Sequence, residues 1–523
     1  MHRVFKKLYL FSKNTYTMNL IPSFSAGTWT LLITFFILLI LYGVWPYGFF
    51  RNLGIPGPRP LPFVGTFLSY IWGFHNFDVQ CFNKYGSIWG IFDGRQPLLM
   101  ITDPEMIKKV MVKDFYTVFT NRRERVLVRP LADALSMVKD GKWKRIRSAL
   151  SPLFTSGRLK EIFPIVERYA DSFIANLKKR NLENPVGIKD IFGPYSMDVV
   201  TSTSFSVDVD SINNPKDPFL SNVKKMLKFS LFNPFFLIIT LFPFTARFFE
   251  KLGVSFVSKS SLDYFYRTVR KIKDEHHIKQ ESQVDFLQLM VQSQILEEKA
   301  NAQESSKPVK GLTDHEILSQ SLVFIIGGYE TTSSTLSVLA HNLATNPTAM
   351  KKLQEEIDSV FPNNSPVTYE ALMQMEYLEM AMNESMRLWP PAPRIERTCK
   401  NAVAIQGVTI PTGTLVVVPT YVLHRDPKIW ESPDTYKPER FSKENREDIN
   451  PYTFLPFGMG PRNCIGMRFA QLITKMVVVK LLQNFSLETC KETQIPLQLN
   501  ALFQPKTPIT LKIVPRTPAR NQE

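Results

Sequence analysis

The stretch that decides the interpretation of this chain reads Phe457-Gly458-Met459-Gly460-Pro461-Arg462-Asn463-Cys464-Ile465-Gly466. It places one cysteine in a glycine-rich turn, directly ahead of an apolar run over roughly 465–484 that predicts a helix. Glycines on both sides of the cysteine let the backbone approach a bulky planar group closely. The amides of the turn and the positive end of the following helix are expected to favour a thiolate at Cys464, and Arg462 carries donors suited to a carboxylate. These features fit haem iron with a cysteine ligand, whereas the plainer interpretation is a buried structural cysteine in a tight loop.

The same ten residues resemble, without a departure, the haem-binding signature of the cytochrome P-450 family, Phe-x-x-Gly-x-Arg-x-Cys-x-Gly. The resemblance implies a mainly α fold with small β-sheets, in which a long central helix lies over the haem. It implies iron protoporphyrin IX as the cofactor, with Cys464 as the axial metal ligand. By the same resemblance, Phe457, Gly460, Arg462 and Gly466 are expected to bind the cofactor.

A long apolar run over residues 26–45 is the second prominent feature, and no charged residue occurs between Lys13 and Arg51. About 20 residues that rise about 1.5 Å each span a hydrocarbon core of ~30 Å. A cleaved signal peptide would have a shorter apolar core followed by small residues. We therefore predict a retained transmembrane helix.

The charges that flank this helix give a mixed signal for its orientation. Arg51 and Arg59 follow it, which favours a cytosolic C-terminal domain, but four basic residues precede it within residues 3–13. Members of subfamily A of cytochrome P-450 family 3 typically start with a segment like that over residues 18–22. Residues 1–17 therefore look like an extension beyond the usual start. The resemblance implies the endoplasmic reticulum membrane, with the catalytic domain on its cytosolic side.

Composition narrows the class of partner. The 523 residues carry a net charge of +16 and are 44% hydrophobic, which suits a large core and an acidic partner or a membrane surface. No zinc-finger spacing and no basic region beside a heptad repeat occurs, so no nucleic acid is expected. The four cysteines are scattered along the chain, which indicates no disulfide framework and fits a reducing compartment.

Five segments are predicted along the chain. They are a lead-in over residues 1–25, the anchor over 26–45, a proline-rich hinge over 46–62, one catalytic domain over 63–515 and a tail over 516–523. Prolines at the density of residues 56–62 end a helix and make a stiff connector. Within the domain, short alternating stretches at 403–405, 408–410 and 415–419 predict small hairpins, and the polar stretch at 297–311 predicts a surface loop.

A long helix is predicted to begin at a capping box, Thr313-Asp314-His315-Glu316, and to end near Thr345, before Asn346-Pro347. About 32 residues would make it about 48 Å long, enough to cross the whole domain.

The centre of this helix has an unusual composition. Gly327 and Gly328 each weaken a helix by roughly 1 kcal/mol relative to alanine, which indicates a place where something fits against the backbone. The stretch resembles the family's oxygen-activation motif, Ala/Gly-Gly-x-Asp/Glu-Thr-Thr. The resemblance implies that Thr331 orients dioxygen and that Glu330 delivers protons. The alternative is a helix whose polar residues face a buried groove.

Further residues are assigned mainly by resemblance. Glu384 and Arg387 share one helical face, and with Arg440 they resemble the family's structural Glu-Arg-Arg triad behind the cysteine loop. Trp143 and Arg147 also share a face.

By resemblance, Trp143 and Arg147 hold a haem propionate, helped by Arg462, Arg397 and Arg122.

The neighbours of that tryptophan, Lys142, Lys144 and Arg145, are predicted to point elsewhere as a basic docking face. No dinucleotide fingerprint is present, so electrons are expected from a separate NADPH-dependent diflavin reductase that such a face would steer. Cytochrome b5 is a further expected partner.

A second apolar region lies over residues 229–249, where Pro234 and Pro243 divide it into pieces too short to span a bilayer. One interpretation is interior packing. The other is an apolar roof that dips into the membrane and guards an entrance for lipid-soluble substrates. The resemblance favours the roof, because family members carry their substrate-access lid here.

The resemblance covers essentially residues 18–515 and is strongest to the drug- and steroid-oxidising subfamily A of family 3. It implies a membrane-bound monooxygenase that inserts one oxygen atom of O2 into lipophilic substrates such as steroids, drugs and other xenobiotics. Two alternatives remain: a reductase-independent haem-thiolate isomerase, and a non-catalytic haem or steroid binder. The presence of Glu330 and Thr331 argues against the isomerase.

The expected substrate pocket departs from the subfamily pattern in two places, over residues 124–130 and at Pro391-Ala392-Pro393. The substrate preferences of the subfamily therefore do not carry over directly to this chain, whereas the expected haem site is unaffected. Ser136, Phe324 and Ile326 are expected to line the pocket.

Overall fold

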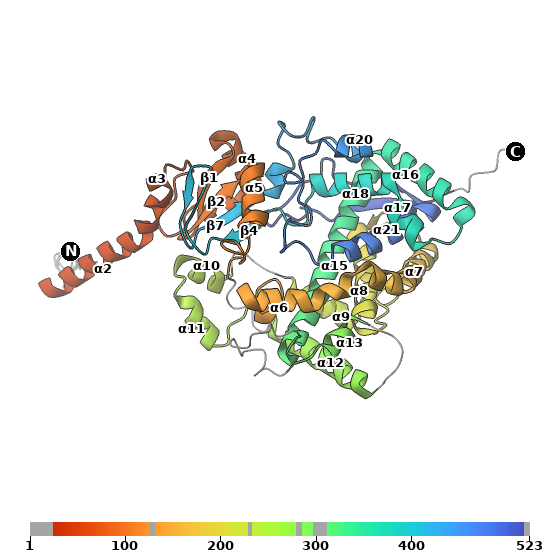
Figure 1. Ribbon diagram of the computed structural model, residues 1–523, viewed down its shortest axis with the longest axis horizontal. Helices are drawn as coiled ribbons and strands as arrows, with labels where there is room; N and C mark the ends of the chain where they lie inside the picture. The colour runs from red at the N-terminus through yellow and green to blue at the C-terminus, as the bar shows by residue number, and fades with distance from the viewer. Residues whose placement is uncertain (1–24, 125–130, 229–232, 279–284, 296–310, 517–523) are drawn as a thin grey trace, which may run out of the picture.

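The computed structural model describes residues 25–124, 131–228, 233–278, 285–295 and 311–516. The predicted extension over 1–17, most of the altered stretch at 124–130 and nearly all of the polar loop at 297–311 lie outside these ranges. Most of the described chain is helical, and the strands β1, β2, β4 and β7 lie at the side of the helical body from which the anchor projects (Figure 1). The predicted mainly α fold is confirmed.

The α-helices are α2 (Ala26–Val44), α3 (Phe49–Asn52), α4 (Phe74–Tyr85), α5 (Pro104–Lys108), α6 (Asp140–Leu150), α7 (Ser156–Lys179), α8 (Ile188–Phe205), α9 (Pro218–Met226), α10 (Pro234–Leu241), α11 (Thr245–Lys251), α12 (Lys259–Ile278), α13 (Phe286–Gln292), α15 (Asp314–Thr345), α16 (Pro347–Val360), α17 (Tyr369–Gln374), α18 (Glu376–Leu388), α19 (Thr420–Leu423), α20 (Lys443–Arg446) and α21 (Met467–Asn484). Short 3₁₀ or π segments are η1 (Trp45–Gly48), η2 (Phe67–Trp72), η3 (Lys109–Lys113), η4 (Leu131–Asp133), η5 (Ser151–Phe154), η6 (Pro362–Asn364) and η7 (Pro438–Phe441). The strands are β1 (Ile88–Asp93), β2 (Gln96–Ile101), β3 (Val186–Gly187), β4 (Ile395–Thr398), β5 (Val403–Ile405), β6 (Val408–Ile410), β7 (Leu415–Val418), β8 (Phe485–Glu488) and β9 (Thr510–Pro515).

Helix α15 runs through the middle of the helical body, as predicted (Figure 1). Its 32 residues begin at the predicted capping box, in which the Thr313 side chain accepts from the Glu316 amide and the Glu316 carboxylate accepts from the Thr313 amide. The helix ends at Thr345, before Pro347 starts the next one. It packs along α8, most of whose side chains are buried, so the two helices form the centre of the core.

Three sheets surround this core. The largest has the order β1-β2-β7-β4, with β2 parallel to β7 and the other neighbours antiparallel. Strands β5 and β6 form the predicted hairpin. The expectation of a further hairpin at 415–419 is wrong, because β7 is buried on both faces and pairs with β2 and β4 instead. The third sheet, β3-β9-β8, closes the C-terminal part, where the Arg516 amide donates to the Asn484 carbonyl at 2.9 Å.

The N-terminal helix α2 projects from the body (Figure 1). Its apolar side chains are largely exposed, and the helical stretch Ala26–Asn52 is long and apolar enough to cross a membrane. The following proline-rich connector is docked on strand β1 rather than free. The Gly90 amide donates to the Pro56 carbonyl at 2.9 Å, and a Cβ atom at Gly57 would lie 2.1 Å from the Gly90 oxygen. The connector therefore fixes the anchor to the sheet.

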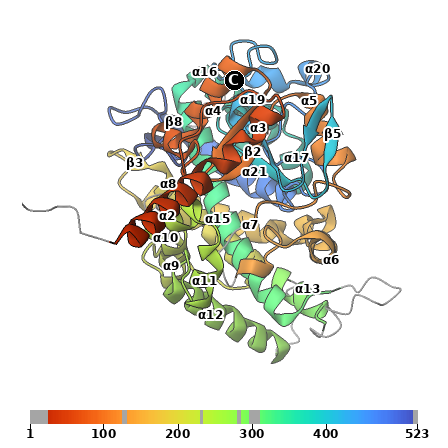
Figure 2. The ribbon, with the colours of Figure 1, turned by 90° about the vertical axis from the view of Figure 1, so that its left-hand side faces the viewer.

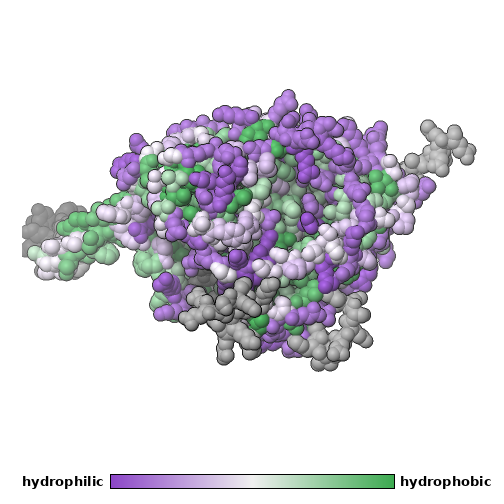
Figure 3. All heavy atoms as spheres, in the orientation of Figure 1, coloured by the Kyte–Doolittle hydropathy of each residue, from purple (hydrophilic) through white to green (hydrophobic). Residues whose placement is uncertain are grey.

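The second apolar region forms α10 and α11 beside the base of the anchor (Figure 2). No residue of α10 is buried, and Phe244 and Phe248 are 70% and 60% exposed. Interior packing therefore does not describe α10, which lies on the surface of the body. In the space-filling view, apolar surface covers the anchor, whereas polar residues cover most of the visible face of the body (Figure 3).

Candidate active site

The cysteine loop is closed by its own backbone. The Cys464 amide donates to the Phe457 carbonyl at 2.8 Å, and the Asn463 amide donates to the Gly460 carbonyl at 3.0 Å. Gly460 has a φ of +75°, and a Cβ atom there would lie 1.9 Å from the Met111 carbonyl oxygen. Only glycine fits this position, because both the conformation and the contact exclude a side chain. The loop thus presents Cys464 just before α21.

The thiol of Cys464 is accessible, yet burial raises its pKa above the ordinary value. The Gly466 amide and the charges of Arg147 and Arg122 lower the pKa in part. The Gly466 amide of the turn therefore favours a thiolate, as expected, but desolvation outweighs it. The Cys464 side chain is accessible although protein atoms surround it, and a metal cation bound to the sulfur would supply the missing positive charge.

Helix α6 holds the loop from one side. The Arg147 guanidinium donates to the Asn463 carbonyl at 3.0 Å and to the Asn463 side-chain oxygen at 2.9 Å. Trp143, one turn earlier, is buried, and its ring centroid lies 5.2 Å from the Arg462 guanidinium. The structure therefore brings Trp143 and Arg147 to the loop as predicted. Asn463 is a partner that sequence reasoning missed, although it lies inside the quoted motif.

An arginine cluster lies beside the cysteine loop. Arg462 is buried and donates to the carbonyls of Thr120 and Val138, both at 2.6 Å, but its Nε atom has no hydrogen-bond partner among the described residues. Burial, with the charges of Arg122 and Arg147, lowers its pKa to about 9. Arg122 donates to the Arg462 carbonyl at 3.4 Å.

Arg397, on strand β4, is fully buried, and its Nε and Nη2 atoms lack hydrogen-bond partners among the described residues. Its pKa lies well below the ordinary value because of burial, and the charges of Arg122 and Arg462 lower it further. A buried cation with unused donors is costly unless an anion accompanies it. The propionates of a haem would provide such anions, so the residues present fit the group.

The centre of α15 provides an open surface. Gly327 and Thr331, one turn apart, are both exposed although the helix crosses the core, and a Cβ atom at Gly327 would meet no atom within 4 Å. Gly328 has a different task, because a Cβ atom there would lie 2.4 Å from a Val200 methyl group of α8. One glycine therefore leaves space beside the helix, and the other allows close helix packing.

The two predicted catalytic residues, Glu330 and Thr331, both form hydrogen bonds within the protein. The Thr331 hydroxyl donates to the Gly327 carbonyl at 2.6 Å. The Glu330 carboxylate accepts from Lys189 of α8 at 2.5 Å and from Ser334 at 3.3 Å. These bonds stay within α15 and α8, so Glu330 and Thr331 form a second group apart from the loop cluster. Sequence reasoning missed Lys189, because nothing in its local pattern points to a residue 141 positions away.

The predicted Glu-Arg-Arg group assembles. The buried Glu384 carboxylate accepts two hydrogen bonds from Arg387, at 2.7 and 2.8 Å, and one from Arg440 at 3.3 Å. Arg387 also donates to the His424 carbonyl at 2.7 Å, and Glu384 accepts from the Lys437 amide at 2.9 Å. The group thereby ties α18 to the segment that leads into the cysteine loop.

The basic docking face needs a correction. Lys142 pairs with Asp133 at 2.7 Å, and Arg145 donates to both oxygens of the buried Glu316. Both cations are paired, and the pairs tie α6 to Asp133 and to the start of α15. Lys142 and Lys144 are nevertheless exposed, and Lys144 has Tyr116 as its aromatic neighbour.

The predicted pocket residues Ser136, Phe324 and Ile326 are half-buried. Phe324 packs against the ring of Phe154 at 5.7 Å between centroids, so it also belongs to the packing of the helices. The proline-rich turn at 391–393 is held by Tyr421, whose amide donates to the Pro393 carbonyl at 3.4 Å.

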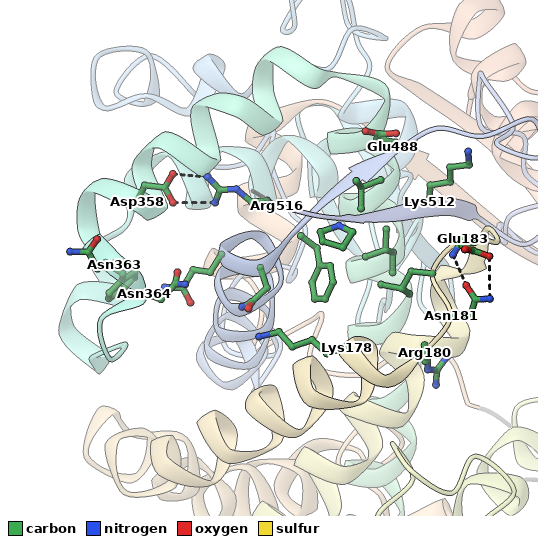
Figure 4. Close-up of a pocket in the computed structure, with 18 of the residues that line it drawn as sticks. Lys178, Arg180, Asn181, Glu183, Asp358, Asn363, Asn364, Glu488, Lys512 and Arg516 are labelled. Carbon is green, nitrogen blue, oxygen red and sulfur yellow. Dashed lines mark hydrogen bonds and ion pairs between the residues drawn. The ribbon is translucent and has the colours of Figure 1, made fainter. Parts of the chain in front are cut away.

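A separate surface pocket of about 990 Å³ lies between the end of α7, η6 and the β8–β9 hairpin (Figure 4). Charged side chains line it, and Arg516 pairs with Asp358 at 2.6 Å at its rim. It contains none of the predicted site residues.

A model of the family described as Cytochrome P450 matches residues 55–513. The chain belongs to the cytochrome P450 family. The match includes the cysteine loop, the long helix α15 and the arginine cluster.

Relatives place this P450 in subfamily 3A. It is 56% identical over 503 residues to Cytochrome P450 3A27 from Oncorhynchus mykiss, and the matched region covers 95% of this chain and 96% of the relative. It is 54% identical to Cytochrome P450 3A29 from Sus scrofa, over 95% of this chain and 99% of the relative. It is 53% identical to Cytochrome P450 3A9 from Rattus norvegicus, with the same two shares.

The protein is therefore a haem-thiolate monooxygenase of the 3A type that oxidises drugs and steroids. It is a microsomal P450, bound to the endoplasmic reticulum membrane through its N-terminal apolar helix, and it receives electrons from a reductase. Membership of this subfamily decides against the isomerase and the non-catalytic binder.

Proposed function

We propose that Cys464 is the iron ligand of this monooxygenase, and that Arg122, Arg397, Arg462 and Trp143 hold the haem propionates. The observation that carries this proposal is the buried Arg397. Two of its nitrogen atoms have no hydrogen-bond partner among the described residues, and the positive charges of Arg122 and Arg462 repel its own. Two carboxylates at this place would accept those donors and balance the charge.

Arg147 has a different part in this proposal. Its guanidinium is directed to Asn463 and so fixes the position of the sulfur, rather than serving a carboxylate alone. Phe457, Gly460 and Gly466 shape the loop through backbone geometry, with Gly466 donating its amide to the sulfur.

The bound haem supplies the activation of dioxygen, and electron donation from the thiolate favours O–O cleavage. The chain supplies the proton path, in which Glu330 carries the proton and Thr331 orients the acceptor. Thr331 is exposed on the open side of α15, next to a glycine that leaves space beside the helix. Glu330 lies one residue away and accepts hydrogen bonds from Lys189 and Ser334, which can pass protons from the surface.

We further propose that α10 and α11 form a membrane-embedded roof over the entrance for lipophilic substrates. Both helices lie next to the base of the anchor and expose large apolar side chains, among them Phe235 and Ile238 of α10 and Phe248 of α11. Such exposure is costly in water and favourable at the edge of a bilayer.

The reductase is proposed to be a diflavin protein that docks near the cysteine loop. Exposed cations there include Lys113, Lys142, Lys144 and Arg468, of which Arg468 lies in the first turn of α21. An acidic flavin domain, or cytochrome b5 as a second partner, would complement this charge.

Spectroscopy of the purified protein tests the iron ligand. The reduced protein should give the carbon monoxide difference band after which the family is named, and Cys464→Ala should abolish it. The matched control is Cys490→Ala, since Cys490 is also free but lies next to Thr493, outside the loop. Retention of the band in Cys464→Ala would show that another side chain binds the iron.

A further inference from the structure

The last turn of the anchor helix α2 is fixed to the catalytic body. A Cβ atom at Gly43 would lie 2.8 Å from the ring of Phe63, and the Phe63 amide donates to the Gly43 carbonyl at 3.1 Å. Phe63 adopts a φ of +65°, a conformation that bulky residues rarely take. The anchor is therefore seated in a specific contact and does not hang from a loose tether.

Tyr42, the preceding residue, joins this seat to the proposed roof. Its ring is stacked on Phe242, the residue that ends α10, with 6.0 Å between centroids and 16° between planes. It also meets Phe244 edge-on at 6.4 Å. The anchor thus contacts the roof through aromatic rings, an arrangement that prefers defined geometry over loose apolar contact.

Arg95 completes the arrangement from the turn between β1 and β2. Its guanidinium carbon lies 3.5 Å from the centroid of the Tyr42 ring, and its Nε atom has no hydrogen-bond partner among the described residues. The neighbouring Gly94 touches α10, because a Cβ atom there would lie 2.3 Å from the Thr240 carbonyl oxygen. Gly94 also accepts a hydrogen bond from the Tyr47 hydroxyl at 3.2 Å. The anchor, the end of α10 and the sheet turn therefore form a closed ring of contacts.

We propose that Tyr42 and Arg95 are positioning residues that fix α10, and with it the entrance for lipophilic substrates, relative to the membrane anchor. The proposal rests on the roof role of α10 and α11 proposed above. Since no residue of α10 is fully buried, its position depends on contacts such as those at its C-terminal end and the packing of Phe236 on Phe67. A cation over an aromatic ring and a stacked ring pair are both stronger when water is excluded, as at the edge of a bilayer.

The test uses the full-length chain in phosphatidylcholine nanodiscs. Hydrogen exchange of the α10 amides reports its attachment, and the stopped-flow association rate of testosterone reports access to the site. Tyr42→Ala and Arg95→Met should each raise exchange of the 238–241 amides about tenfold and change the association rate. Tyr42→Phe and Arg95→Lys, which keep a ring and a cation, should restore wild-type behaviour.

Phe35→Ala is the matched control, because Phe35 is a lipid-facing aromatic residue of the same helix and packs on Phe36. It should change neither readout. If Tyr42→Ala lacks the carbon monoxide band of folded protein, Phe242→Ala takes its place in the test, because it removes the other ring of the stacked pair.

Unchanged exchange in both Tyr42→Ala and Arg95→Met would overturn the positioning role, whatever the association rate does. Raised exchange with an unchanged association rate would instead overturn the roof role of α10 and the effect on access, while the contact itself would stand. The two readouts thus separate failure of this inference from failure of the proposed roof.

Discussion

Arg147 of α6 and Asn463 of the cysteine loop are joined by two hydrogen bonds, at 3.0 and 2.9 Å. Asn463 directly precedes Cys464, so a helix more than 300 residues earlier in the chain helps to set the position of the sulfur. This relationship gives Arg147 a role that its helical spacing with Trp143 does not reveal.

Removal of the Asn463 side chain should loosen the loop. Asn463→Ala loses one charge-assisted hydrogen bond, worth about 1.5–3 kcal/mol, and should lower both the free energy of unfolding and the haem content. Urea unfolding and the carbon monoxide band measure the two effects. Arg468→Ala is the control, because its guanidinium makes a 3.3 Å contact with Ser156 on the exposed surface. An equal loss in both variants would contradict the role of the pair.

Arg397→Met should change the haem-free and the haem-loaded protein in opposite directions. Without haem, two nitrogen atoms of the buried Arg397 lack partners among the described residues, and an apolar replacement of similar length is expected to stabilise the fold by about 1–4 kcal/mol. With haem, the variant loses a propionate partner and should release the haem faster. Thermal unfolding of both forms and transfer of haem to apomyoglobin check this pair of effects. Destabilisation of the haem-free form would show that protein groups already satisfy Arg397.

Gly460→Ala should prevent correct assembly of the loop. The added Cβ atom would lie 1.9 Å from the Met111 carbonyl oxygen, at a φ of +75° that disfavours side chains. We expect a loss of several kcal/mol, about 3 or more, and little incorporated haem. Gly466→Ala is the matched substitution, since its Cβ atom would meet a Phe154 ring atom at an ordinary 3.7 Å. It should keep the stability of the haem-free protein, and similar destabilisation of the haem-free protein by the two substitutions would refute the steric argument.

Glu330→Gln should lower kcat while leaving KM nearly unchanged. A proton relay contributes about 10²–10⁴-fold to a rate, and the amide keeps the shape without the proton. Steady-state oxidation of testosterone with purified reductase measures the effect. Ser334→Ala, which removes only a 3.3 Å contact to Glu330, should have a small effect. A wild-type kcat in Glu330→Gln would remove Glu330 from the proton path.

The contact between Asp133 of η4 and His315 of α15 should depend on pH. A hydrogen bond from His315, at 2.8 Å, and the Lys142 ammonium lower the pKa of Asp133 to about 2. The resulting stability is fully present above the unfolded pKa of about 4 and is lost as the pH falls from about 4 to about 2. Asp133→Asn should therefore be about 1–2 kcal/mol less stable at pH 7, with a gap that closes towards pH 2. Urea midpoints between pH 7 and pH 3 measure it, and a constant gap would exclude the carboxylate as its source.

Much of the fold was predictable because local signals agreed with the tertiary structure. The capping box at Thr313 sets the start of α15 and Pro347 sets its end, both at the predicted residues, since each signal acts within one helical turn. The prediction of a hairpin at 415–419 is wrong, because β7 is buried on both faces and pairs with β2 and β4, and no local pattern specifies these partners.

The sequence by itself determined the glycine-rich cysteine loop, the apolar N-terminal helix and the long helix α15, because each depends on neighbouring residues whose chemistry is fixed by type and spacing. Only the tertiary structure decided which charges are free and which are paired. It directs Arg145 to Glu316 and Lys189 to Glu330, and it leaves Arg397 buried with unused donors. Charge pairing depends on distance and burial in space, which residues far apart in the chain acquire only when they fold together.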